Sequence, residues 1–218
     1  MKIEDMKQGQ ENSSMHEAAV YMQEPEEKAP GEYTIEDYYR FPQERRVELI
    51  DGVIYDMASP THIHQLIGGQ IFKAFSNYID RKKGDCIVAY APLDVQLDRD
   101  DKTMVQPDVM IICDRDKFQK GLVYGAPDLL VEILSRSTKK KDMTIKLAKY
   151  AEAGVREYWI VDPERKKVIV YDFEDDMNVS IYGFESEVPV GIFHGECKVD
   201  FREIYDYVSF LFPGDGVK

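Results

Sequence analysis

Residues 128–134, Asp128-Leu129-Leu130-Val131-Glu132-Ile133-Leu134, decide the fold of this chain. A continuous apolar run of this length is typical of a strand that is covered on both faces of a sheet. On the two-residue period of a strand, Glu132 shares a face with Leu130 and Leu134. A buried carboxylate is strongly destabilising unless it is neutralised, paired or bound to a metal. The position of Glu132 therefore indicates either a structural salt bridge or a functional site, and its surroundings favour the site.

The segments around this strand predict helices and strands in alternation. Thr34, followed three residues later by Asp37, predicts a capping box for a short helix through Tyr39. The hairpin signal Asp51-Gly52 joins two apolar runs, and residues 62–81 have the periodicity of an amphipathic helix.

A basic helix follows the Glu132 strand, with Thr138 or Asp142 as its cap, Tyr150 in its buried stripe and Gly154 as its stop. Further strands are expected at 87–97, 105–112, 155–162 and 167–173, and a terminal helix near 202–211. Pro107 restricts the second of these strands to a strand beginning, an edge or a bulge. This order predicts an α/β (α+β) sandwich, with a mixed central sheet flanked by helices.

The length of 218 residues suits one large domain with its own hydrophobic core. Residues 1–30 are rich in Glu, Gln, Met and Ser and lack periodicity, so we expect a flexible tail there and a single domain over residues 31–212. No segment reaches the ~18 apolar residues that cross a bilayer, and the start of the chain lacks a signal-peptide pattern.

The three cysteines, Cys86, Cys113 and Cys197, are far apart and odd in number. We interpret this as typical of a reducing cytoplasm, without a zinc-finger site or a disulfide framework. The expected location is cytoplasmic, with no membrane partner.

The net charge of −13 is unfavourable for binding nucleic acid, but it is unevenly distributed. Residues 136–149 hold six basic residues and one acid. We therefore predict that a phosphate backbone approaches directly after the Glu132 strand. The expected nucleic-acid contacts are Arg136, Lys139, Lys140 and Lys141.

Asp108 and Glu132 are carboxylates on two consecutive predicted strands, each beside apolar residues. Adjacent carboxylates repel each other unless one is protonated or a cation lies between them. Oxygen ligands suit Mg²⁺ or Mn²⁺, which can activate water against a phosphodiester. Lys146, on the helix that follows, is the candidate to stabilise charge or position the water. The predicted catalytic residues are Asp108, Glu132 and Lys146, with the metal on the two acids.

Other chemistries have weaker support in the sequence. It contains no P-loop, no Gly-x-Ser-x-Gly and no Gly-x-Gly-x-x-Gly, so no nucleotide cofactor is expected. His62 and His64 lie two apart on a helix and do not converge, which argues against a zinc site.

Pro107-Asp108, followed by Glu132-x-x-Ser135 on a strand and then a basic helix, resembles the PD-(D/E)XK restriction-endonuclease-like superfamily. Three further motifs are ELIDG at 48–52, PDLLVEILS at 127–135 and EYWIVDP at 157–163. With them the chain is similar, more closely, to a family of restriction-endonuclease-like proteins of unknown target that is widespread in bacteria. The resemblance covers residues 33–173 and implies cleavage of DNA with a divalent metal on Asp108 and Glu132, often by a homodimer.

One departure from the superfamily pattern concerns its lysine, which would fall at Leu134. Lysines that have moved to the following helix occur in the superfamily, which supports Lys146. Glu48, His64 and Gln96 are possible outer residues of the site, although a structural role is favoured for each.

Three hypotheses follow. The first is a Mg²⁺-dependent endonuclease that hydrolyses DNA. The second, favoured by the acidic charge and Leu134, is a catalytically lost nuclease fold that binds DNA or protein. The third is a hydrolase of small phosphoesters, which would need a closed pocket instead of an open basic groove.

Overall fold

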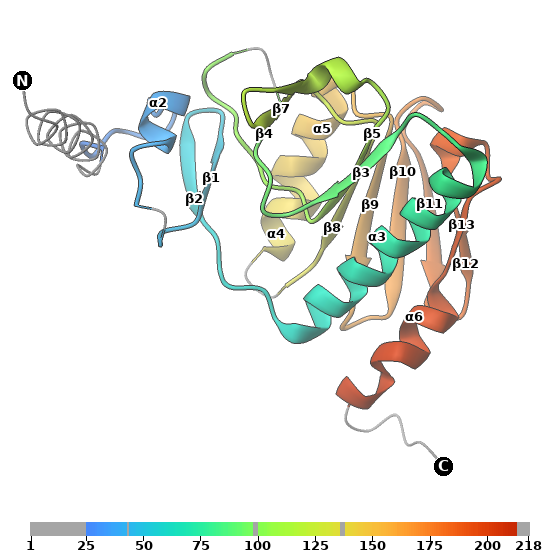
Figure 1. Ribbon diagram of the computed structural model, residues 1–218. Coiled ribbons are helices and arrows are strands. Elements are labelled where there is room, and N and C mark those ends of the chain that lie inside the picture. The colour runs from blue at the N-terminus through green and yellow to red at the C-terminus, as the bar shows by residue number, and fades with distance from the viewer. Residues whose placement is uncertain (1–24, 43, 98–99, 136–137, 213–218) are drawn as a thin grey trace, which may run out of the picture. The chain divides into compact units, whose positions relative to one another are not determined.

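The computed structural model describes residues 25–42, 44–97, 100–135 and 138–212. The chain divides into two compact units, Met1–Ala58 with Asp100–Met104, and Ser59–Arg99 with Val105–Lys218. Figure 1 shows the elements of both units in chain order. Most of the expected tail, residues 1–24, lies outside the described residues. The expected single domain over residues 31–212 stays a prediction.

The first unit is built on the predicted hairpin. Strands β1 (Val47–Ile50) and β2 (Val53–Asp56) pair antiparallel. The turn residues Asp51 and Gly52 have φ angles of 51° and 71°. Positive φ at both central positions is the geometry that an Asp-Gly hairpin turn favours. The hairpin prediction is confirmed.

The predicted capping box is also present in the first unit. Thr34 caps α2 (Ile35–Tyr38), and its side chain accepts a hydrogen bond from the backbone of Asp37, whose carboxylate in turn accepts from the Thr34 backbone. The Nζ atom of Lys28 lies 2.6 Å from the Asp37 carboxylate. Residues that the sequence assigned to the end of a tail therefore contact this helix.

The second unit contains a six-stranded sheet with the order β11-β10-β9-β8-β5-β3. Strands β8 and β9 are parallel, and every other neighbouring pair is antiparallel. The sheet is therefore mixed, as predicted. Its strands are β3 (Ile87–Tyr90), β5 (Val109–Ile112), β8 (Leu129–Ile133), β9 (Glu157–Asp162), β10 (Lys167–Asp172) and β11 (Asn178–Gly183).

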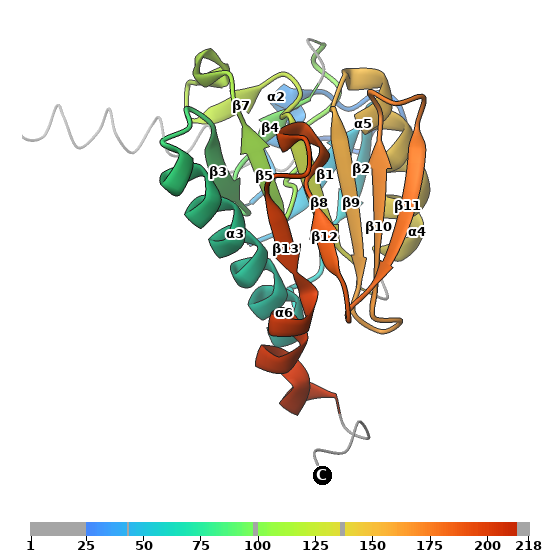
Figure 2. The same cartoon turned by 90° about the vertical axis from the view of Figure 1, so that its right-hand side faces the viewer.

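Helices cover both faces of this sheet (Figures 1 and 2). On one face, α3 (His62–Lys82) and α6 (Phe201–Val208) pack against the main core. Val131 and Ile133 of β8 belong to that core, so Glu132 between them points to the opposite face. There Tyr150 of α5 (Leu147–Ala153) packs edge-on against a tyrosine of β9.

The basic segment after β8 is helical but irregular. A short turn, α4 (Lys139–Lys141), leads into a π-helical turn over Asp142–Lys146 and then into α5. Helix α5 ends at Gly154 in the left-handed conformation, with φ of 87°. The predicted stop is confirmed, and this helix makes the crossover between the parallel strands β8 and β9.

Two strand predictions were wrong in their extent. The segment 87–97 forms β3 and then β4 (Val95–Gln96), which belongs to a three-stranded sheet with β6 (Phe118–Gln119) and β7 (Leu122–Tyr124). Strand β5 begins at Val109 instead of 105. The physical reason is the same in both cases, because Pro92 and Pro107 have no N–H to continue a ladder.

The C-terminal part of the second unit completes the α3 face. Strands β12 (Glu187–Pro189) and β13 (Lys198–Asp200) pair antiparallel and lead into α6. The terminal helix was expected near residues 202–211. Within the described residues, no helix is both long and apolar enough to cross a membrane.

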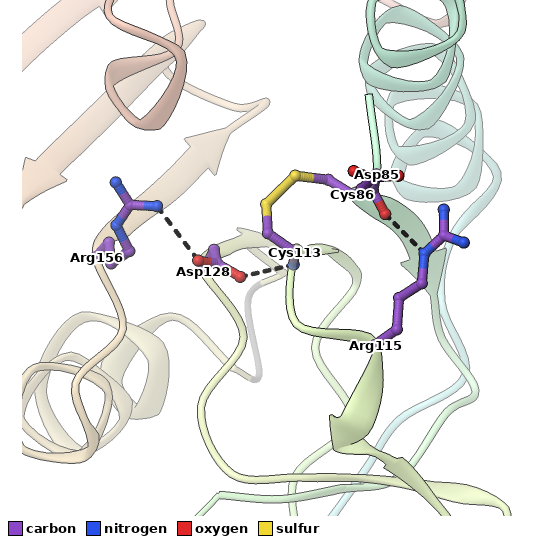
Figure 3. The surroundings of a disulfide bond; sticks show 6 residues. All are labelled: Asp85, Cys86, Cys113, Arg115, Asp128 and Arg156. Carbon is purple, nitrogen blue, oxygen red and sulfur yellow. Dashed lines mark hydrogen bonds and ion pairs between the residues drawn. A yellow bond between two sulfur atoms is a disulfide. The ribbon is translucent and has the colours of Figure 1, made fainter. Parts of the chain in front are cut away.

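Cys86 and Cys113 form a disulfide, with Cα atoms 3.9 Å apart (Figure 3). The register pairs Ile87 of β3 with Ile112 of β5, so the next residues outward face each other across the two strands. The expectation that the cysteines form no disulfide was wrong. Their pairing follows from strand register between segments 27 residues apart, which cysteine spacing does not reveal.

Candidate active site

Asp108 lies immediately before β5, at the end of that strand nearest Glu132. The ladder pairs Val109 with Val131, so Asp108 lies one position beyond the last pair, beside Glu132 of β8. Its Oδ2 atom accepts a hydrogen bond of 2.7 Å from the backbone N–H of Ile133. This bond fixes the Asp108 carboxylate against the backbone that follows Glu132.

His64 holds the same carboxylate from helix α3. Its Nε2 atom lies 3.0 Å from Asp108 Oδ2, and the two side chains are 14% and 16% exposed. The other ring nitrogen, Nδ1, is buried and has no hydrogen-bond partner among the described residues. Thr61 caps α3 by accepting from the His64 backbone N–H, which sets where the helix and its histidine begin.

Glu132 is buried on the other face of the sheet, where it is 3% exposed. Its Oε1 atom accepts hydrogen bonds of 2.7 Å from Lys146 Nζ and 2.7 Å from the Tyr150 hydroxyl. Lys146 Nζ also lies 3.6 Å from Asp142 Oδ1. The buried charge of Glu132 is thus paired and hydrogen-bonded, as a buried ion must be.

A second tyrosine closes this polar cluster. The Tyr158 hydroxyl donates a hydrogen bond of 3.2 Å to the Asp142 backbone carbonyl. Burial raises the pKa of Tyr158 well above its usual value, and the nearby Glu132 raises this pKa further. Tyr158 therefore stays neutral in the folded protein and adds no charge beside the ion pair.

The structure thus brings Lys146 to Glu132, and it brings Asp108 to the strand position beside Glu132. The two carboxylates, however, engage helices of opposite layers, because Asp108 is held by His64 of α3 while Glu132 is held from α5. Among the described residues, no cluster of three or more His, Cys, Asp or Glu side chains is arranged to hold a metal ion. The predicted catalytic and metal-binding roles of these residues stay predictions.

The other predicted site residues belong to three different elements. His64 is the outer residue that contacts Asp108. Gln96 lies in β4 of the three-stranded sheet, and Glu48 lies in β1 of the first unit. The outer roles of Gln96 and Glu48 stay predictions.

The predicted nucleic-acid contacts lie before and within α4. Lys140 is exposed, whereas Lys139 is partly buried and its Nζ lies 2.7 Å from Asp162 Oδ2. Lys141 is partly buried. The remaining residue of this set, Arg136, lies outside the described residues.

Sequence reasoning missed the contribution of Tyr150 and Asp142 to the Glu132 cluster. It assigned Tyr150 to a buried stripe and Asp142 to a possible cap. The available signal was spacing, because Asp142, Lys146 and Tyr150 recur every four residues and so share one helical face.

A mixed sheet between helical layers, with acids at adjacent strand positions and a lysine on the next helix, defines a restriction-endonuclease-like fold. A crystal structure of a protein from Anabaena variabilis, described as a putative nuclease of the DUF820 family, superposes with a TM-score of 0.67. The match covers 80% of this chain and 98% of that one, at 18% sequence identity. It shows the fold.

Sequence comparison then gives the family. The chain belongs to the Uma2 family, described as "Putative restriction endonuclease", whose family model matches residues 35–191. An uncharacterized protein of Synechocystis sp. is 30% identical over 144 residues, which cover 65% of this chain and 74% of that protein. Family and fold together support a nuclease-like role.

Proposed function

We propose that this protein is a Mg²⁺- or Mn²⁺-dependent endonuclease that hydrolyses phosphodiester bonds in DNA. The observation that carries the proposal is the position of Asp108 beside Glu132 on neighbouring strands, with the Lys146 ammonium held on Glu132. Membership of the Uma2 family supports the same chemistry.

The donor set fits a hard divalent cation. Asp108 and Glu132 supply carboxylate oxygens, which Mg²⁺ and Mn²⁺ prefer. Mg²⁺ keeps several waters and takes further oxygens from substrate phosphates, so two protein carboxylates are sufficient. Asp108 and Glu132 would hold the ion, and because the two carboxylates engage helices on opposite faces of the sheet, binding by both would require one of them to leave its present partners. The ion when bound would activate water and neutralise charge on the phosphodiester.

The chain's own residues prepare this site. The Lys146 ammonium pairs with the buried Glu132 carboxylate at 2.7 Å. The Tyr150 hydroxyl donates to the same oxygen and so fixes the orientation of the carboxylate. On the other face, His64 and the Ile133 N–H hold Asp108 Oδ2 and leave its Oδ1 atom for an incoming ligand.

The DNA backbone would approach along the basic segment after β8. Exposed Lys140, with Lys139 and Lys141 beside it, supplies positive charge on a chain whose net charge is −13. Arg136 belongs to the same proposed contact. A homodimer, which the family resemblance implies, would place two such segments on one duplex.

A second candidate function is a nuclease fold that has lost catalysis and binds DNA or protein. The burial of Glu132, at 3% exposure, favours it, because both Lys146 and Tyr150 already use one oxygen of that carboxylate. The test must therefore separate metal binding from cleavage.

The test is nicking of supercoiled plasmid in Mn²⁺ by wild type, Asp108→Asn and Glu132→Gln, with calorimetric titration of Mn²⁺ on the same proteins. Asp128→Asn is the matched control. Like Asp108, Asp128 accepts a backbone N–H at 2.7 Å, in its case from Cys113, and it contacts a nitrogen-bearing side chain, that of Arg156 at 3.3 Å (Figure 3).

We expect Asp108→Asn and Glu132→Gln to lose nicking by at least about 100-fold and to lose the heat of Mn²⁺ binding, while Asp128→Asn keeps both. Nicking that survives in both site variants would reject the site. Mn²⁺ heat that depends on Asp108, without nicking by wild type, would favour the catalytically lost module.

A further inference from the structure

A cavity of about 290 Å³ opens beside Asp108, on the α3 side of the second unit. This volume lies near the lower end of the range for small-molecule sites, roughly 300–1,000 Å³. Neither Glu132 nor Lys146 lines it, so it is separate from the buried ion pair. Its principal walls are His64, Gln65, Gly69, Phe72, Tyr90 and Asp108.

Two aromatic rings form one side of the cavity. Phe72 of α3 and Tyr90 at the end of β3 pack edge to face, with ring centroids 4.9 Å apart and planes at 73°. Tyr90 is 59% exposed, so much of this ring is open to solvent. Exposed aromatic rings are the groups on which unpaired bases stack, because every base has a π-face.

Two glycines of α3, Gly68 and Gly69, line the cavity without a side chain. A Cβ atom at Gly68 would lie 3.2 Å from Ile133 Cδ1, so Gly68 allows the helix to approach β8 closely. A Cβ atom at Gly69 would meet nothing within 4 Å. Glycine inside a helix is destabilising relative to alanine, and packing gives no reason for it at position 69. Gly69 leaves space at the cavity.

The polar groups of the cavity suit an uncharged heteroaromatic ring. Asp108 and His64 lie at one end, and Gln65 adds an amide that both donates and accepts hydrogen bonds. The lining, all of it within the described residues, includes no lysine or arginine. A cavity without a lysine or arginine is poorly suited to a phosphate group, but amide and carboxylate groups can bind the edge of a base.

From these observations we infer that the cavity takes one unstacked nucleobase of the DNA substrate, next to the bond that is cut. This inference rests on the proposed function, since it places the base beside the predicted metal ligand Asp108. The substrate class is then single-stranded DNA, or a duplex opened at one nucleotide. A base held here would place its own phosphate near the Asp108 carboxylate.

Binding of oligonucleotides without metal tests the inference independently of cleavage. The probes are one fluorescent single-stranded oligonucleotide and the same strand in a duplex, measured by anisotropy in EDTA at low salt. The variants are Tyr90→Ala, which removes the stacking ring, and Gly69→Leu, which fills space with a good helix former. Tyr207→Ala is the matched control, because Tyr207 is a similarly exposed tyrosine, at 53%, on α6 outside the cavity.

We expect wild type to bind the single strand at least about tenfold more tightly than the duplex. Tyr90→Ala and Gly69→Leu should each weaken single-strand binding about tenfold, a loss of the size measured when a base loses its aromatic stacking partner. Both variants should leave duplex binding unchanged. Tyr207→Ala should bind like wild type. Thermal melting of each variant checks that it is folded.

Equal affinity for both probes, or equal losses on both in the Tyr90→Ala variant, would overturn the inference. Plasmid nicking in Mn²⁺ on the same preparations separates the two proposals. The expected binding pattern without nicking by wild type supports the cavity and rejects the proposed function. Nicking without single-strand preference keeps the proposed function and rejects the cavity.

Discussion

At the scale of single residues, the pair Lys146–Glu132 dominates the energetics of the candidate site. Both side chains are almost fully buried, and Nζ lies 2.7 Å from Oε1. Desolvation of two ions offsets much of their attraction, so the pair itself adds little stability. Removing one partner is different, because it leaves the other charge buried without compensation.

Lys146→Met is therefore expected to destabilise the protein by about 3–5 kcal/mol. Glu132→Gln should destabilise the wild-type protein but stabilise the Lys146→Met variant, because there it removes an unpaired charge. Urea unfolding of the four proteins measures the coupling free energy, expected at about 0.5–3 kcal/mol. Additive effects of the two substitutions would show that the ion pair is not formed.

At the scale of elements, glycines show why backbone conformation and open space must be considered together. A Cβ atom would meet nothing within 4 Å at Gly69 or at Gly154. Gly69 lies in the interior of α3, whereas Gly154 ends α5 with φ of 87°. Both positions have room for a Cβ atom, but only Gly154 has a positive φ that disfavours other residues.

Gly69→Ala is expected to stabilise the protein by about 0.5–1 kcal/mol, because alanine loses less conformational entropy in a helix. Gly154→Ala is expected to destabilise it by about 1–2 kcal/mol, since an L-residue is strained at positive φ. Comparing the denaturant midpoint of each variant with that of wild type shows whether its unfolding free energy rises or falls. A stabilising Gly154→Ala would mean that α5 does not end in the left-handed conformation.

At the scale of the whole molecule, the disulfide joins the edge strand β3 to β5 within the large sheet. The bond closes a loop between two residues that are 27 apart in the sequence. It joins the start of β3 to the end of β5, and Asp108 lies at the other end of β5. Cross-linking a loop of this length restricts the unfolded chain and so stabilises the folded one. The third cysteine, Cys197, is buried, and burial raises the pKa of its thiol to about 11.

The double variant Cys86→Ser/Cys113→Ser is expected to lose about 3–4 kcal/mol of unfolding free energy relative to the oxidised protein. Thiol titration in denaturant should find one thiol before reduction and three after it, from the three cysteines of the chain. Reductant should lower the stability of wild type and leave that of the double variant unchanged. Three thiols without reductant would contradict the disulfide.

Features that depend on neighbours along the chain could be predicted from the amino-acid sequence. The Asp51-Gly52 hairpin, the Thr34 cap, the Gly154 stop and the buried Glu132 strand each follow from local conformational preference or periodicity. The mixed sheet followed from their order. The break within the expected strand 87–97 could also have been predicted from the sequence, because Pro92 lies at it. It was missed because the residues on either side alternate like one continuous strand.

Which side chains meet could be learned only from the folded chain. Strand register placed Asp108 beside Glu132 and Cys86 opposite Cys113, and periodicity carries no register between distant strands. The two acids then contact different helical layers, Asp108 with His64 of α3 and Glu132 with Lys146 on the opposite face. The physical reason is that a strand pattern fixes on which face a residue lies, whereas the partner on that face depends on which helix the chain folds over it.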